Sequence, residues 1–169
     1  EIASCLVGSE MCIRDRIMTK IILQTKIKAP IETVFNLSRN IDIHQESASS
    51  SKEKVIAGKT SGLIELNETV TWKGKHFGIY LKHSSKITEM EFPNYFVDIM
   101  EKGHFKSFRH EHYFEEKNGF TTMKDLLTYE TPFGIFGRIF DYILLKNHMK
   151  NFLLERNTIL KNIAENQTK

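Results

Sequence analysis

The residues with the clearest chemical potential are a histidine and an aspartate, His112 and Asp125, on either side of Asn118-Gly119. Asn-Gly favours the positive φ angles of a two-residue hairpin turn, so Lys117 is predicted to pair with Phe120. Counting outward from this turn places the imidazole opposite the carboxylate on one face of the hairpin. Such a pair can serve as a general base, orient a ligand or satisfy two buried polar groups. We favour the structural or ligand-orienting role.

The rest of that hairpin face is predicted to be mostly apolar. A three-residue loop with a bulge would shift the register by one residue and set Lys124 opposite His112 instead. With the two-residue turn, the His/Asp pair faces the interior of the domain. The further pairs that follow from the count are Phe114 with Met123, His110 with Leu127, and Phe108 with Tyr129.

The histidines of this hairpin also raise the question of a metal. His110 and His112 lie two residues apart on the predicted strand, so both imidazoles point to the same side. Strand His-x-His sites bind zinc in some enzymes but require a third protein ligand, for which His76 is the candidate. Because nothing in the sequence places His76 beside the other two, we predict neither a metal site nor a cofactor.

These residues need a sheet to hold them, and the sequence predicts one. Residues 19–28 alternate between apolar and polar and indicate a half-buried strand. Pro30 suits the first turn of a helix that continues to Ser38, and a second short helix is predicted over 41–45. Residues 46–60 are polar and indicate a loop or a poorly formed strand. Further strands are predicted at 63–72, 76–87, 95–101 and 105–115, with Lys73-Gly74-Lys75 as the first hairpin turn.

A single long helix is predicted at the end of the chain, from Phe133 to Ala164. Its apolar residues recur mostly in steps of three and four and draw one broad stripe that a sheet must cover. We therefore predict an α+β helix-grip fold: a curved antiparallel sheet wrapped around the long helix, two short helices after the first strand, and a pocket between sheet and helix. The stripe consists of Ile135, Ile139, Tyr142, Ile143, Met149, Phe152, Leu153, Leu160 and Ile163.

Many aromatic residues lie on the predicted strands and helix, and some are expected to line that pocket. An aromatic, apolar lining favours a small apolar ligand. The residues predicted to bind it, with the His/Asp pair orienting its polar end, are Trp72, Phe77, Phe108, His110, His112, Asp125, Tyr129, Phe136 and Met149.

The 169 residues fit one domain, predicted to span 18–165. A net charge of +3 with both signs interspersed argues against nucleic-acid binding, and no apolar run suggests membrane insertion. Residues 1–17 resemble the translation of a sequencing adapter fused ahead of a gene, so Met18 is the expected native start and no targeting signal is predicted. Cys5 and Cys12 both lie in that stretch, so no disulfide is expected and the predicted location is the cytoplasm.

The order of these signals resembles the START-like superfamily, also known as SRPBCC or helix-grip proteins. The resemblance is carried by residues 27–35, which read IKAPIETVF, and by Pro132-Phe133-Gly134 ahead of the long helix. More narrowly, the chain is similar to an uncharacterised bacterial branch sometimes labelled cell-division-inhibitor-like, through residues 41–44, 68–72, 76–78, 108–112, 123–125 and 155–157. The resemblance implies a cavity for a small hydrophobic molecule between the sheet and the C-terminal helix.

Three functions stay open at this point, because one fold can serve binding, transfer or catalysis. Binding or transfer of a small apolar molecule is the interpretation we favour. An enzyme of the cyclase or hydratase kind that uses the His/Asp pair is the first alternative. A protein that interacts with the cell-division machinery is the second, and it rests on the label of the similar branch.

Overall fold

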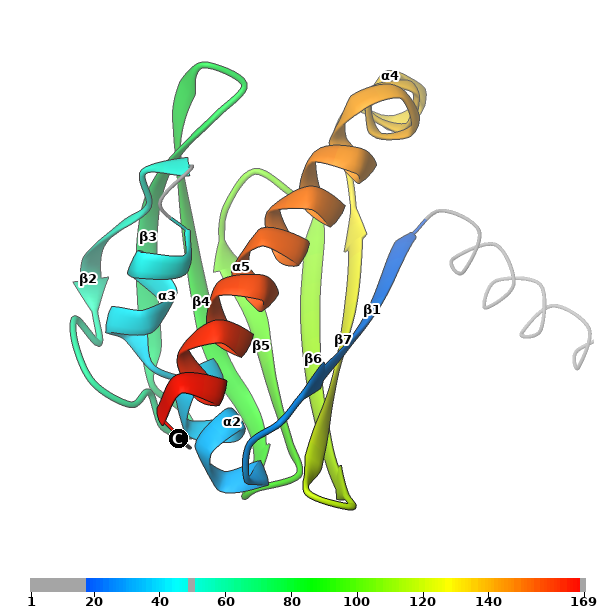
Figure 1. Ribbon diagram of the computed structural model, residues 1–169. Helices are drawn as coiled ribbons and strands as arrows, with labels where there is room; N and C mark the ends of the chain where they lie inside the picture. Colours follow the sequence, from blue (N-terminus) through cyan, green and yellow to red (C-terminus); the bar gives the residue numbers. More distant parts are fainter. Residues whose placement is uncertain (1–17, 49–50, 168–169) are drawn as a thin grey trace, which may run out of the picture.

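The computed structural model describes residues 18–48 and 51–167, so the predicted N-terminal extension lies outside the described residues. One antiparallel sheet of seven strands, in the order β1-β7-β6-β5-β4-β3-β2, forms the first layer, and the helices form the second (Figure 1). The strands are β1 (Thr19–Ile27), β2 (Lys54–Gly58), β3 (Thr69–His76), β4 (Ile79–Glu91), β5 (Tyr95–Lys102), β6 (Ser107–Lys117) and β7 (Phe120–Glu130). The helices are α2 (Ile31–Ser38), α3 (Ile41–Ser47), α4 (Gly134–Phe140), the π-helical segment η2 (Asp141–Leu145) and α5 (Lys146–Gln167).

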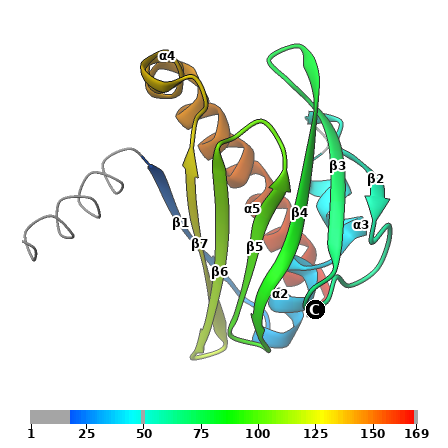
Figure 2. The same cartoon turned by 180° about the vertical axis from the view of Figure 1, so that it is seen from behind.

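The curved sheet wraps around α5, which crosses its concave face, and α2 and α3 close one side of the same face (Figure 1). From behind, the view is of the uncovered face of the sheet (Figure 2). Leu160 and Ala164 of α5 are buried in a core with Phe35 of α2 and with Phe96 and Phe114 from the sheet. This is the α+β helix-grip arrangement that the sequence predicts.

The hairpin between β6 and β7 has the predicted register. Asn118 and Gly119 both adopt positive φ angles, as a two-residue turn requires. His112 pairs with Asp125, and the other predicted pairs, from Lys117 with Phe120 to Phe108 with Tyr129, are also present. The prediction made from the Asn-Gly turn is therefore confirmed.

The first predicted hairpin turn is wrong. β3 continues through Lys73-Gly74-Lys75 to His76, and the chain turns at Phe77-Gly78, both of which have positive φ. Gly74 serves a different purpose, because a Cβ atom there would lie 2.7 Å from the Glu53 side chain. The glycine makes room for a side chain from the neighbouring loop rather than for a turn.

The predicted C-terminal helix is present, but its first half is not covered by the sheet. The positions of α4 and η2 that are most closely packed on the sheet side include Gly137 and Asp141, and a Cβ at Gly137 would overlap the carbonyl oxygen of Pro132. Asp141 accepts hydrogen bonds from the hydroxyls of Tyr129, at 2.5 Å, and Thr19. Glycine and a hydrogen-bonded aspartate therefore attach this half to the sheet, while most of its apolar residues point outward. Those predicted to be buried but found exposed are Ile135, Ile139, Tyr142 and Ile143.

Candidate functional site

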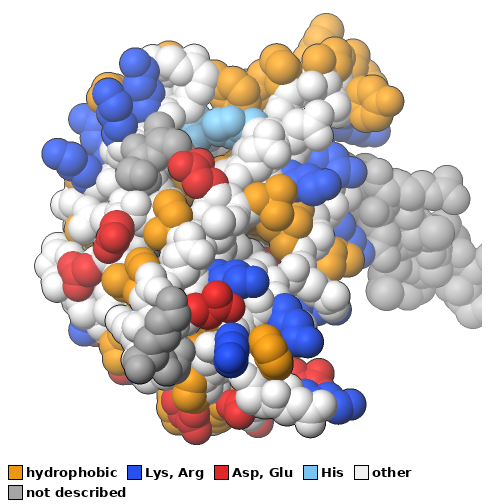
Figure 3. Space-filling view, viewed as in Figure 1, with side chains coloured by type: hydrophobic (Ala, Val, Ile, Leu, Met, Phe, Trp, Pro, Cys, Tyr) orange, Lys and Arg blue, Asp and Glu red, His pale blue; other side chains and the backbone are white. Residues whose placement is uncertain are grey.

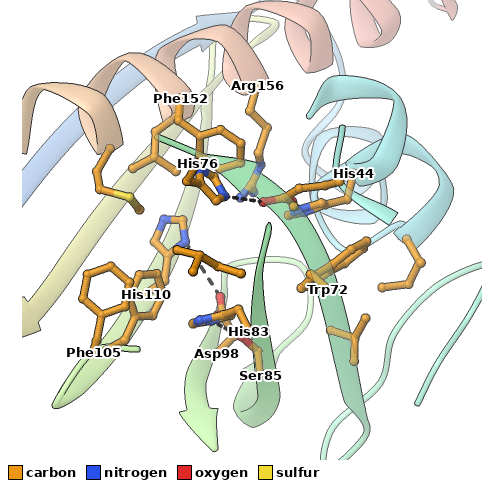
Figure 4. Close-up of a pocket in the computed structure, with 18 of the residues that line it drawn as sticks. His44, Trp72, His76, His83, Ser85, Asp98, Phe105, His110, Phe152 and Arg156 are labelled. Atoms are coloured by element: carbon orange, nitrogen blue, oxygen red, sulfur yellow. Dashed lines mark hydrogen bonds and ion pairs between the residues drawn. The ribbon is translucent and has the colours of Figure 1, made fainter. Parts of the chain in front are cut away.

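A cavity of about 180 Å³ lies between the sheet and α5 (Figure 4). All seven histidines of the chain contribute to its lining. The cavity therefore combines an apolar lining with an unusual concentration of imidazoles. Its large apolar lining residues include Trp72, Phe96, Phe105, Phe108, Met149, Phe152 and Leu153.

One wall of the cavity carries two adjacent buried histidines, His110 and His112, whose ring centroids lie 3.9 Å apart. Strand alternation places both on the inner face of β6. On the β5 side, Asp98 Oδ2 lies 3.4 Å from His112 Nε2 and 3.8 Å from His110 Nδ1. On the β7 side, Asp125 Oδ1 lies 2.9 Å from His112 Nδ1 and 3.2 Å from His110 Nε2. Each imidazole is thus placed between two carboxylates; we call these four residues the histidine wall.

Asp125 lies behind the imidazoles and does not line the cavity. Its side chain is fully buried, and its Oδ2 atom accepts a hydrogen bond of 2.6 Å from Asn157 Nδ2 of α5. Asp125 Oδ1 lies close to both His112 Nδ1 and His110 Nε2. Those three atoms have no hydrogen-bond partner among the described residues.

The pKa values of the two histidines of the wall are shifted in opposite directions. Burial, together with the neighbouring His112, lowers the pKa of His110 from 6.5 to about 4. Burial also acts to lower the pKa of His112, but Asp125 and Asp98 outweigh it, so this pKa is raised. Burial favours the neutral form of Asp98, yet the two histidines hold the pKa of this carboxyl well below its usual range. The wall therefore holds ionised carboxylates around one neutral and one readily protonated imidazole.

A second polar cluster lies on another side of the cavity. Glu53 contacts His44 Nε2 of α3 at 3.0 Å and His76 Nε2 of β3 at 3.4 Å, each through a different carboxylate oxygen. His76 Nδ1 lies 3.0 Å from His148 Nε2 of α5. Burial acts to raise the pKa of Glu53, but the two histidines lower it to about 2. The ring of His44 stacks on that of Trp72 with centroids 4.1 Å apart.

Six of the predicted ligand-binding residues line the cavity and three do not. Asp125 is behind the histidines, and Tyr129 is buried with its hydroxyl bonded to Asp141. Phe136 is 77% exposed, because it lies on the uncovered half of the C-terminal helix. The six lining residues are Trp72, Phe77, Phe108, His110, His112 and Met149.

The sequence prediction missed several polar residues of the cavity. Asp98 comes from β5, whose register with β6 no turn motif fixes, and it lies opposite His110. Glu53 precedes β2 in a segment predicted only as a polar loop or weak strand. Arg156 has the sequence context of a solvated helix face, but it is buried and reaches into the cavity from α5 (Figure 4). His76 joins the cluster around Glu53 and is not a partner of His110 and His112.

Comparisons with known proteins show similarity at the level of structure. No family model and no curated protein sequence matches the chain. A START superfamily protein from Mycobacterium smegmatis aligns with a TM-score of 0.67 and 12% identity, over 88% of this chain and 98% of that one. Major latex-like protein 151 from Panax ginseng gives a TM-score of 0.64 and 16% identity over 88% and 98%.

A third solved structure, a protein from Thermus thermophilus, aligns with a TM-score of 0.66 and 18% identity, over 84% of this chain and 97% of that one. At such identities the likeness concerns the fold and carries no residue roles. The sheet wrapped around α5 and these alignments show that the chain has the helix-grip fold, which it shares with a START superfamily protein.

Proposed function

We propose that the protein binds a small apolar molecule in the cavity and exchanges it at an anionic lipid surface. The observation that carries the binding proposal is the cavity itself, which lies between the sheet and α5 and has a mostly apolar lining surface. Apolar pockets with a few convergent polar groups are typical of small-molecule sites. Asp98, His110 and His112 of the histidine wall and Arg156 are among the polar groups of the lining, so the ligand should carry a polar end.

The exchange proposal rests on the surface around one end of the cavity. Phe77, at the tip of the β3–β4 hairpin, contacts Phe140 of α4 and also lines the cavity, with the two rings 5.3 Å apart. The hairpin tip and α4 lie at the same end of the molecule (Figure 1), where apolar side chains gather over α4 (Figure 3). We call this the apolar end surface. Its exposed large apolar residues are Phe77, Ile79, Tyr80, Phe133, Ile135, Phe136, Ile139, Phe140, Tyr142, Ile143 and Leu144.

The charges of the same two segments favour a lipid surface over another apolar partner. Residues 69–88 contain no acidic side chain, and residues 131–150 contain a single one, the buried Asp141. Exposed cationic side chains surrounded by large apolar ones suit the interface of an anionic membrane. The exposed cationic residues are Lys73, Lys75, Lys82, Arg138, Lys146 and Lys150. Among the described residues, no helix combines the length and apolarity needed to cross a bilayer.

Native mass spectrometry of the purified protein tests the binding proposal. We expect a molecule with a mainly hydrocarbon body to be released on denaturation, and a fluorescent apolar probe to displace it. If the released molecule is chemically altered on incubation, the enzyme alternative gains support. A cavity that retains no apolar molecule and takes up no probe would contradict binding.

Co-sedimentation with lipid vesicles tests the exchange proposal. Vesicles of phosphatidylcholine with phosphatidylglycerol should bind the protein more tightly than vesicles of phosphatidylcholine alone. The double variant Phe136→Ser/Ile139→Ser should weaken binding at least about tenfold, because each large apolar side chain that leaves water contributes about 1.5–3 kcal/mol. The matched control is Ile22→Ser, which removes an exposed apolar residue from β1. Equal losses for both variants would contradict a specific surface.

A further inference from the structure

The histidine wall has the composition and spacing of a metal site with an open coordination position. One nitrogen each from His110 and His112 and a carboxylate oxygen of Asp98 lie within 4.8 Å of one another. Within the part of the chain that the structure describes, this is the only group of three or more His, Cys, Asp or Glu side chains that meets this distance. We propose that Asp98, His110 and His112 bind a divalent transition-metal ion, with zinc as the best-fitting ion.

The distances agree with zinc geometry. Zinc binds imidazole nitrogen and carboxylate oxygen at about 2.0–2.2 Å, so two ligand atoms of a tetrahedral site lie about 3.3 Å apart. His112 Nε2 and His110 Nδ1 lie 3.4 and 3.8 Å from Asp98 Oδ2. An ion could therefore occupy the space between them after small side-chain movements.

Asp125 has the position of a supporting carboxylate. Metal-bound histidines usually donate their second N–H group to a carboxylate, which fixes the tautomer and the ring orientation. The nitrogens that face away from Asp98, His110 Nε2 and His112 Nδ1, lie 3.2 and 2.9 Å from Asp125 Oδ1. Both nitrogens and this oxygen have no hydrogen-bond partner among the described residues. Small ring rotations on metal binding would turn these contacts into two hydrogen bonds.

The charge and location of the histidine wall also favour binding of a divalent cation. Asp125 and the two imidazoles are buried, the Asp98 side chain is 18% exposed, and Asp98, His110 and His112 face the cavity. A divalent cation would compensate the two negative charges without requiring both imidazoles to be protonated. The fourth coordination position would open into the cavity, where a water molecule or an oxygen atom of a bound molecule can occupy it.

The test is zinc binding by the full chain after treatment with a chelator and dialysis, measured by competition with a chromophoric zinc chelator. This test needs no apolar ligand, so its result is independent of the proposed function. We expect one zinc ion per chain. Asp98→Asn and His110→Gln should each weaken binding by more than about 100-fold, and Asp125→Asn by about 10- to 100-fold, the usual range for a supporting carboxylate. His44→Gln, a cavity histidine outside the wall, is the matched control and should change affinity less than about threefold.

Two further measurements keep the proposal testable if a variant is poorly folded. Zinc should raise the melting temperature of the wild-type protein and of His44→Gln, but not that of Asp98→Asn. Cobalt bound to the wild-type protein should show the intense visible absorption of a tetrahedral site. Absence of zinc binding, unchanged affinity in Asp98→Asn, or loss of binding in Glu53→Gln instead would each overturn the proposal.

Discussion

The two halves of the C-terminal helical run share an amphipathic sequence pattern but have opposite environments. In α5, the apolar positions Leu153 and Leu160 are buried against the sheet and α2. In α4 and η2, apolar residues at the same helical spacing are exposed, Ile139 by 50% and Tyr142 by 85%. The difference arises at the buried positions of the two halves. Those of α5 include the large apolar residues Met149, Leu153 and Leu160, whereas those of the first half include Gly137 and Asp141. A periodic stripe thus shows that a helix has an apolar face without showing what covers it.

Truncation of one side chain in each half gives the largest expected contrast. Leu160 is 2% exposed, so Leu160→Ala should lower the free energy of unfolding by about 3 kcal/mol through lost burial and a residual cavity. Ile139→Ala should change it by less than about 0.5 kcal/mol, because the side chain is mostly in water already. Urea unfolding of both variants provides the measurement. Equal losses would mean that the two halves are packed alike, and the comparison would fail.

The next largest expected effect is the pH dependence of stability. It depends on the histidine wall, which α5 covers, and not on the exposed α4 and η2. Because the pKa of His110 is about 4 in the folded chain and 6.5 in the unfolded chain, the unfolded state binds its proton first as the pH falls. The metal-free protein should therefore lose stability between pH 6.5 and about 4, by at most about 3 kcal/mol, since one pKa unit corresponds to about 1.4 kcal/mol.

His110→Gln should flatten this pH dependence, and chemical unfolding across the window measures it. The pKa of His112 is raised above 6.5, so the folded state binds its proton more tightly than the unfolded state. This contribution to stability is present at low pH and is lost as the pH rises above 6.5. The carboxyls of Asp98 and Asp125 have lowered pKa values, so they change stability only below about pH 3.8, outside this window. His104→Gln, which replaces an exposed histidine, is the control. A steep dependence that persists in His110→Gln would show that another group is responsible.

A polar contact of α5 gives the smallest of the three effects. Asn157→Ala removes the 2.6 Å hydrogen bond to buried Asp125 and should lower the free energy of unfolding by about 2 kcal/mol, the cost of an unpaired buried acceptor. The neighbouring Thr158→Ala, on the exposed side of the same helix, should be close to neutral. Thermal and urea unfolding check both. If Asn157→Ala is neutral, α5 does not support the wall.

The sequence predicts the fold well where a local signal fixes geometry. Asn118-Gly119 determines a turn type, the turn determines a register, and the register correctly pairs His112 with Asp125. The cavity between sheet and helix follows from the order of the elements. Gly74 shows the limit of such signals, because a glycine between two lysines suggests a turn, whereas this one gives space to Glu53.

The candidate site is less predictable because it joins residues from elements without a common local signal. Asp98 meets the histidines through the β5–β6 pairing. Lys102-Gly103 indicates a turn between those strands but, unlike Asn118-Gly119, does not define a turn type that would set their register. Arg156 looks like a solvated helix residue, since its burial depends on how α5 lies on the sheet. The prediction places Phe136 in the cavity for the same reason: periodicity cannot show where coverage by the sheet ends.

The stacking of Trp72 on His44 has a practical consequence. Trp72 is the only tryptophan of the chain, so the near-ultraviolet emission of the indole reports on the cavity alone. The centroid of its ring lies 4.1 Å from that of the His44 imidazole. Because this stacked imidazole is part of the immediate surroundings of the indole, the emission intensity should change when an incoming molecule displaces the ring of His44. The protein thus contains its own optical probe, and occupancy of its interior can be followed without a label.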